Sequence, residues 1–137
     1  MSGFSAVMPP PAGADSLGCA SPADLARARR LVRRRGAGAG LDEEVVADLV
    51  LAVNEVLTNA LVHGGPPVLL HLYPAGDTWV CHVQDGGRVA LDPLTGTTSP
   101  AALSEDGYGL WLARQLCADV DISTHASGTH VRLHMRV

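Results

Sequence analysis

The order and spacing of the apolar residues predict an α/β (α+β) two-layer sandwich, with helices on one face of a mainly antiparallel mixed sheet. Apolar residues recur with helical spacing over 22–35 and again over 42–64, and then the pattern changes. "PVLLHLY" at 67–73 and "TWVCHVQD" at 78–85 have the composition of strands and are joined by a short hairpin connection. A helical run opened by glycines follows at 107–120, and two further strands, "VDISTH" and "THVRLHMRV", complete the chain.

Both long helices have recognisable ends. Ser21 and Pro22 resemble an N-cap followed by proline at the first helical position. The glycine-rich "GAGAG" at 36–40 breaks the chain after the first helix. Asp42 is placed to cap the second helix, with two glutamates in its positive first turn, and a pair of glycines ends it.

The first helix carries six arginines in nine residues, "RARRLVRRR". Such a run could bind an acidic partner or nucleic acid, or it could be a solvated helix face. The net charge of −4 favours the solvated face and argues against a nucleic-acid-binding domain. All ten Lys and Arg residues are arginines, which excludes a Walker-type phosphate loop and lysine Schiff-base chemistry.

The length of 137 residues suits one domain, which we expect over 21–137. Residues 1–20 contain three consecutive prolines and are expected to form a disordered tail, in which "GFSAVM" could pair as an edge strand. No signal-peptide pattern and no uninterrupted apolar stretch of about 18 residues is present, so we expect a cytoplasmic protein without membrane contact. The three cysteines form no CxxC pair, which argues against a disulfide framework or a cysteine metal site.

The second helix carries polar residues on one line. Glu55, Asn59 and His63 are spaced four apart within "NEVLTNALVHG", and this spacing places them on one helix face. A carboxylate and an amide on an otherwise apolar helix indicate either a ligand site or a partly exposed helix edge. His63 could lie at the rim of such a site or cap the helix C-terminus.

Three glycine-bearing stretches follow this helix. Asp85 and the next two glycines end a strand, "GYG" at 107–109 opens a helix after the long loop 86–106, and Gly128 with Thr129 lies in a turn. Each alone is a common structural feature. Their order behind the polar helix is the specific signal, and a loop as long as 86–106 is usually functional.

The predicted strands also carry four histidines, His71, His82, His130 and His134. Solvent-facing positions are the simplest interpretation. A zinc site is the alternative, but no tight ligand spacing supports it.

These stretches together resemble the GHKL (histidine-kinase-like) ATPase superfamily, in particular its anti-sigma-factor, serine-protein-kinase branch. "NEVLTNALVHG" is similar to the family's N-box, "VQDGG" and "GYGLWLARQL" to its two glycine boxes, and "SGTHVRL" to its last box. The resemblance covers about residues 22–136 and implies the histidine-kinase-like ATPase fold.

The resemblance also implies roles for single residues. Asn59 would ligate Mg²⁺ through its side-chain oxygen, and Glu55 would be the catalytic general base. Asp85 would accept a hydrogen bond from the adenine amino group, with Gly87 in the pocket floor and Thr129 near the base. The amides around Gly107 and Gly109 would hold phosphates at a helix N-terminus, and residues 88–106 would form the ATP lid. The implied nucleotide-binding set is Asn59, Asp85, Gly87, Arg88, Gly107, Tyr108, Gly109, Leu110 and Thr129.

Two positions depart from the family pattern. Val89 stands where the first glycine box usually has a further glycine, and Tyr108 stands where this branch commonly has arginine. Arg88 is therefore the one basic residue between Asp85 and Gly109. Phosphoryl transfer depends on positive charge around the phosphates, so nucleotide binding is the firmer expectation and turnover the weaker one.

We therefore expect a Mg·ATP-binding regulatory serine/threonine protein kinase of the anti-sigma type. Its implied partners are a small anti-anti-sigma protein, which it would phosphorylate, and a sigma factor, which it would hold; a homodimer is an open possibility. Two alternatives are a non-catalytic binding module gated by nucleotide and a weak ATPase whose partner supplies a missing cation.

Overall fold

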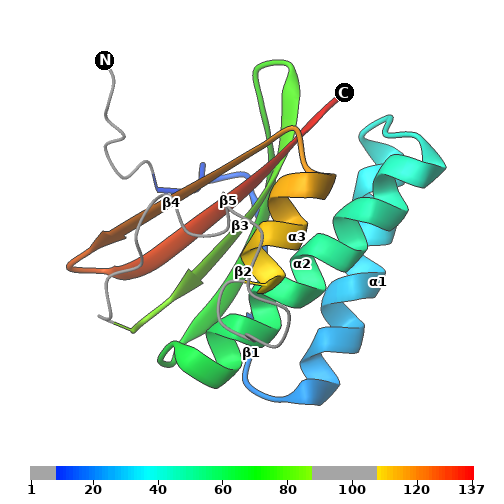
Figure 1. The fold of residues 1–137 in the computed structure, drawn as a ribbon. Coiled ribbons are helices and arrows are strands. Elements are labelled where there is room, and N and C mark those ends of the chain that lie inside the picture. The colour runs from blue at the N-terminus through cyan, green and yellow to red at the C-terminus, as the bar shows by residue number, and fades with distance from the viewer. Residues whose placement is uncertain (1–8, 88–107) are drawn as a thin grey trace.

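The computed structural model describes residues 9–87 and 108–137, which form two layers (Figure 1). Five strands form a single sheet in the order β1-β2-β3-β5-β4, and every described pairing is antiparallel. All three described helices lie on one face of this sheet (Figure 1). The predicted two-layer sandwich is confirmed, with an antiparallel sheet in place of a mixed one. The elements in chain order are β1 (Asp15–Cys19), α1 (Pro22–Gly38), α2 (Glu43–His63), β2 (Val68–Ala75), β3 (Thr78–Asp85), α3 (Tyr108–Leu116), β4 (Asp119–His125) and β5 (Gly128–Arg136).

The core lies between α2 and the sheet. Leu49, Val53 and Leu57 of α2 are fully buried against residues such as Leu70 and Leu133 from the strands. Within the described residues α2 is the one helix whose length and composition would allow it to cross a membrane. Its apolar side is instead the side that packs into the core, and core helices of this length and composition are common.

Helix α1 is longer than the sequence predicts. It continues through "GAG" to Gly38, whereas the glycines indicated an end at residue 35. The reason is packing: a Cβ on Gly36 would lie 3.3 Å from Val46 Cγ2 and 3.5 Å from a ring atom of Trp79. Glycine lets the helix approach this close, and the tertiary contact outweighs the low helix propensity of glycine. The chain leaves the helix at Gly40, which has a φ of +91°.

The prediction of disorder through residue 20 is wrong for residues 15–19, which form β1. This strand pairs along β2 from Asp15 opposite Leu72 to Cys19 opposite Val68. "DSLGC" has too few apolar residues to show a strand pattern, and its conformation comes from the partner strand. "GFSAVM" lies outside the described residues.

Helix α3 is shorter than predicted. It ends at Leu116, and Val120, expected at the end of the helix, belongs to β4. The amide of Ala118 donates to the carbonyl of His134 at 2.9 Å, so the chain joins the sheet directly after the helix.

The histidines lie on the sheet face opposite the helices, but three of them are not solvent-facing. His71, His82 and His130 are 8%, 0% and 3% exposed, so the expectation of solvent exposure is wrong for them. They are close to one another because they stand on neighbouring strands, and their rings shield each other. Hydrogen bonds satisfy their ring nitrogens, and those of His71 lie 2.7 Å from Ser16 Oγ and 3.3 Å from Gln84 Oε1. His134, which is partly exposed, donates from Nε2 to Asp121 at 2.9 Å.

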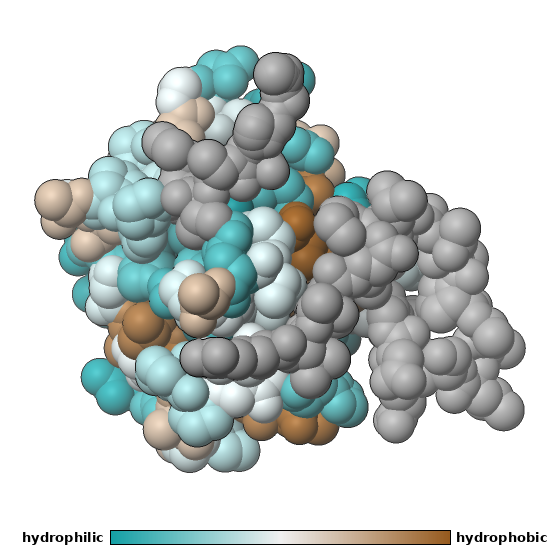
Figure 2. Space-filling view, turned by 90° about the vertical axis from the view of Figure 1, so that its left-hand side faces the viewer, coloured by the Kyte–Doolittle hydropathy of each residue, from teal (hydrophilic) through white to brown (hydrophobic). Residues whose placement is uncertain are grey.

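A chain of hydrogen bonds crosses this face, and we call it the histidine network. Tyr73 Oη is 3.0 Å from His82 Nδ1, and His82 Nε2 is 2.9 Å from His130 Nδ1. His130 Nε2 is in turn 3.0 Å from Ser127 Oγ in the turn between β4 and β5. On the side of the molecule where β4 and β5 join, the described surface is mainly hydrophilic, with small, separate hydrophobic patches (Figure 2).

Candidate functional site

The N-terminus of α3 lies directly against the polar face of α2. A Cβ on Gly109 would come within 3.0 Å of Asn59 Nδ2 and 3.3 Å of Glu55 Cβ. A methyl group at position 109 would therefore require the side chain of Asn59 or Glu55 to shift by a few tenths of an ångström. The structure brings Glu55, Asn59 and Gly109 together and places the N-terminus of α3 beside an amide and a carboxylate. The binding of a nucleotide by these residues stays a prediction.

Glu55 and Asn59 are half-buried and have no partner within the described part of the chain. Neither side chain hydrogen-bonds to another described residue. The neighbouring Asn54 differs, because its Oδ1 accepts a hydrogen bond from Arg29 of α1 at 2.8 Å. Polar groups held in a partly apolar setting without protein partners are available to a ligand.

Asp85 ends β3 beside the C-terminal end of α2, and its side chain is fixed before any ligand binds. It is 8% exposed, and its Oδ1 accepts a hydrogen bond from the amide of Gly87 at 2.7 Å. The backbone amide of Gly65 also donates to this carboxylate. Burial raises the pKa of Asp85 above its ordinary value, and the two amide hydrogen bonds oppose that rise. The remaining lone pairs of the carboxylate can accept a hydrogen bond from a ligand.

Thr129 and Gly128 close the other side of Asp85. Gly128 has a φ of +115°, and a Cβ there would collide with the Asp85 carbonyl oxygen, so only glycine fits this turn. Thr129 is 4% exposed, and its Oγ1 lies 3.4 Å from the carbonyl oxygen of Gly87. Asp85, Gly87 and Thr129 thus lie together at the end of β3, and their contact with adenine stays a prediction.

Several predicted residues are less well placed by the structure. Arg88, Gly107 and the lid segment 88–106 lie outside the described residues, and Tyr108 begins α3. Leu110 is 4% exposed and belongs to the hydrophobic core. Its contact with a nucleotide stays a prediction, and the group that could make it is its backbone amide in the first turn of α3. His63 is exposed in the last turn of α2.

Gly64 and Gly65, which the sequence indicates only as a helix end, also lie against Asp85. Gly64 caps α2, as expected, but Gly65 also binds the Asp85 carboxylate through its amide. The available signal was the second glycine, since one is enough to end a helix.

The donor set fits Mg²⁺ held mainly by phosphate and water. Among residues 9–87 and 108–137, no group of three or more His, Cys, Asp or Glu side chains is arranged to hold a metal ion. The side-chain oxygen of Asn59 is a hard ligand without a partner among the described residues, and Mg²⁺ at nucleotide sites often takes only one or two protein ligands. The residues present therefore suit a metal that arrives with a nucleotide, and they do not form a metal-binding cage.

Comparison with known proteins agrees with this geometry. Residues 19–135 match the family model described as "Histidine kinase-like ATPase domain". The RsbU and RsbW domains of Rv1364c from Mycobacterium tuberculosis are similar in structure, with a TM-score of 0.63 and 24% identity over 89% of this chain. The histidine kinase domain of a blue-light activated histidine kinase from Erythrobacter litoralis has a TM-score of 0.54 and 22% identity over 83% of this chain.

The two structural matches show the shared fold, and the chain spans only 32% and 59% of their respective lengths. No curated protein matches the sequence. The family match covers nearly all of the folded part, including the polar face of α2, Asp85 and Thr129. The chain therefore belongs to the histidine kinase-like ATPase domain family and is a nucleotide-binding domain of the GHKL superfamily.

Proposed function

We propose that this domain binds Mg·ATP and is a regulatory serine/threonine protein kinase of the anti-sigma type. The observation that carries the proposal is the pair Glu55 and Asn59, which face the N-terminus of α3 and have no partner in the part of the chain that the structure describes. The likeness to a protein with an RsbW domain supports the same branch. We place its action in the cytoplasm.

In this proposal each end of the site has one task. Asp85 reads the amino group of adenine, and the amides at the start of α3 bind phosphate oxygens. Asn59 ligates Mg²⁺, which when bound neutralises charge on the phosphates. Helix α2 connects the two ends, because Asn59 precedes Gly64 by little more than one turn and Gly64 lies against the Asp85 carboxylate.

Glu55 would act as the general base. It takes the proton from a serine or threonine hydroxyl of the partner protein. The hydroxyl oxygen forms a bond to the γ-phosphorus while the bond from that phosphorus to the bridging oxygen breaks, which leaves ADP. The partner is a small anti-anti-sigma-type protein, and a sigma factor is the protein that the domain holds until that partner releases it.

A transfer assay with radiolabelled γ-phosphate tests the proposal. The partner is first captured from the native cell and identified by mass spectrometry. Wild type should label a serine or threonine of that protein, and Glu55→Gln should lose most of the rate, about 10²- to 10⁴-fold. Arg29→Lys, far from the phosphates in this scheme, is the matched control. Equal labelling by wild type and Glu55→Gln would contradict the kinase assignment.

A second candidate is a binding module that nucleotide gates without turnover. The observation that favours it is the lack of positive charge among the described candidate site residues. None of them is cationic: Glu55, Asn59, Asp85, Gly87, Gly109 and Thr129. Transition-state charge in phosphoryl transfer is usually balanced by Lys or Arg as well as metal. In this case ADP and ATP would bind and change partner affinity, while no label would be transferred.

A further inference from the structure

The turn between α2 and β2, residues 64–67, contacts Asp85 and its neighbours through backbone atoms. The amide of Gly86 donates to the carbonyl oxygen of Gly65 at 2.7 Å, and the amide of Gly65 donates to the Asp85 carboxylate. A Cβ on Gly65 would lie 3.2 Å from the backbone nitrogen of Gly87. The turn 64–67 and the segment 85–87 at the end of β3 are therefore held together by backbone contacts.

Gly64 leaves no room for a side chain on the face of the turn toward Asp85. A Cβ there would lie 2.7 Å from Asp85 Cγ and Oδ2, and 2.7 Å from the carbonyl oxygen of Ala60. The Ala60 carbonyl cannot yield, because it accepts the last helical hydrogen bond, from the Gly64 amide at 3.0 Å. An added methyl group would therefore displace the carboxylate.

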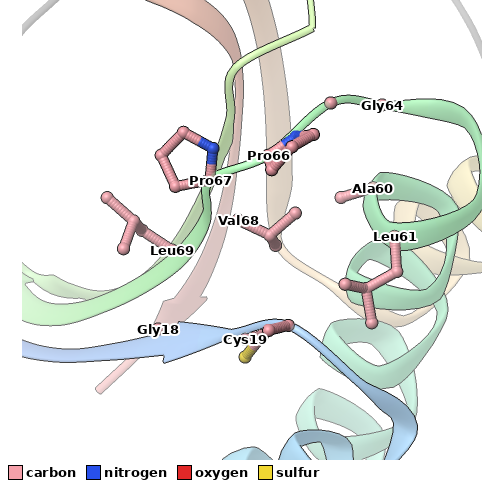
Figure 3. Close-up of a pocket in the computed structure, with 11 residues that line it drawn as sticks. Gly18, Cys19, Ala60, Leu61, Gly64, Pro66, Pro67, Val68 and Leu69 are labelled. Carbon is pink, nitrogen blue, oxygen red and sulfur yellow. The ribbon is translucent and has the colours of Figure 1, made fainter.

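The other face of the same turn is open. It borders a pocket of about 450 Å³ between the end of β1, the last turns of α2 and the start of β2. Figure 3 shows Pro66, Pro67 and Val68 along one side of this pocket and Cys19 and Leu61 along the others. Side-chain packing does not support the turn from behind, so its backbone bonds to residues 85–87 fix its place.

We propose that the Gly64–Gly65 turn is the positioning element for base recognition, because it holds the Asp85 carboxylate in the orientation that accepts the amino group of adenine. The inference rests on the proposed binding of adenine nucleotide. Burial and the two amides of Gly65 and Gly87 are the influences on the Asp85 pKa, and no charged side chain of the described residues contributes. The orientation of Asp85 and its ionisation thus depend on the same two amides.

Base discrimination tests this role and separates it from general stability. ADP and IDP carry the same phosphates, but the hypoxanthine of IDP lacks the amino group that Asp85 would bind. Wild type should bind ADP at least about tenfold more tightly than IDP, and Gly64→Ala should bring this ratio close to one by weakening ADP alone. A structural defect without a positioning role would weaken both nucleotides equally.

Controls make each outcome informative. Gly38→Ala has open space around the new methyl group and should keep the wild-type ratio. In an Asp85→Asn background, Gly64→Ala should cause no further change, since the two substitutions act on one group. The acidic limb of ADP binding should also move to higher pH in Gly64→Ala, because the displaced carboxylate loses a hydrogen bond that favours its charged form.

The failures of the two proposals are distinguishable. If Gly64→Ala does not fold, Gly65→Ala, whose added methyl meets neighbours at 3.2 Å, replaces it. Wild type that binds neither nucleotide would contradict the proposed function. Wild type that prefers ADP beside a folded glycine variant with the same preference would overturn the positioning role.

Discussion

Two groups of polar side chains stand on opposite sides of the sheet, and the protein treats them differently. In the histidine network on the outer face, Tyr73, His82, His130 and Ser127 each find a partner in another side chain. On the inner side, Glu55 and Asn59 lie half-buried on the central helix and find none among the described residues. From the sequence alone, both groups look like polar residues in apolar surroundings. Only the side chains of the histidine network form hydrogen bonds with one another.

The difference separates structure from function. A polar group that the fold satisfies contributes to stability, and its loss leaves its partner unpaired. A polar group that the fold positions but leaves unpaired is available to a ligand. Asp85 lies between the two cases, since two amides orient it while part of its hydrogen-bonding capacity stays free. Substitutions on the two sides should therefore change different measurements.

The largest expected effect is on stability, from His82→Ala. His82 is fully buried, and its removal takes one hydrogen-bond partner from Tyr73 Oη, removes the partner of His130 Nδ1 and leaves a cavity. The free energy of unfolding should fall by about 3 kcal/mol in chemical denaturation, while ADP affinity stays within about twofold. His63→Ala, at an exposed position, is the control and should change neither. A loss of affinity without loss of stability would contradict the comparison.

Asp85→Asn should change ADP affinity more than it changes stability, the opposite of His82→Ala. The amide keeps the size of the carboxylate but presents a donor to the amino group of adenine, so ADP affinity should fall about tenfold or more, at least about 1.4 kcal/mol. Calorimetry on both proteins measures this. Equal ADP affinities would remove Asp85 from the base site.

Substitutions of Asn59 and Glu55, the two polar residues on one face of α2, should differ in their effect on ATP binding. Asn59→Ala should weaken ATP binding by a few-fold to about tenfold in the presence of Mg²⁺, and much less in its absence, because a metal ligand is lost. Glu55→Ala should leave binding nearly unchanged, or tighten it by removing a negative charge near the phosphates. Calorimetry with and without EDTA compares them. Loss of binding in Glu55→Ala but not in Asn59→Ala would reverse the assigned roles.

The smallest effect is the response of the histidine network to acid. Burial, with the nearby Arg132 and other histidines, lowers the pKa of His82 to about 3 and that of His130 to about 4. Both are neutral in the folded protein, while the unfolded chain takes up protons near its ordinary pKa of 6.5. The contribution to stability is therefore nearly complete one pH unit above that value and falls as the pH drops through it toward 4.

Between pH of about 7.5 and about 6.5 the loss should be roughly 0.4 kcal/mol for each of the two histidines. Denaturation at several pH values measures it, and His130→Gln should reduce the slope because glutamine does not titrate. An unchanged slope in His130→Gln would mean that this histidine is not held neutral by the fold.

Much of the fold could be predicted because local patterns and tertiary packing agree. The N-cap residues and the helical spacing of apolar residues are enough to indicate α1 and α2. The apolar patterns of β2 and β3 are enough to indicate strands. The predictions that were wrong concern segments whose conformation depends on residues far away in the sequence. β1 takes its conformation from β2, and α1 continues through Gly36 because Val46 and Trp79 pack there. The burial of the histidines depends on the register of three strands, which the sequence does not reveal.

Part of the candidate site could also be predicted from local patterns in the sequence. Gly87 and Gly128, next to Asp85 and Thr129, stand where an added Cβ would collide with neighbouring atoms, and such requirements for glycine are visible in a sequence. The role of Gly65 was not, because its amide rather than its side chain acts.

The central claim is that nucleotide binds to the unpaired polar groups of α2 and to Asp85, and not to the outer face of the sheet. Backbone amide NMR of the isotope-labelled protein during titration with Mg·ADP tests this most directly. The largest shift changes should occur at Asn59, Asp85, Gly87, Gly109 and Thr129, while His71 and His82 change little. Shifts that are largest along the histidine network, or absent from Asn59 and Asp85, would contradict the account.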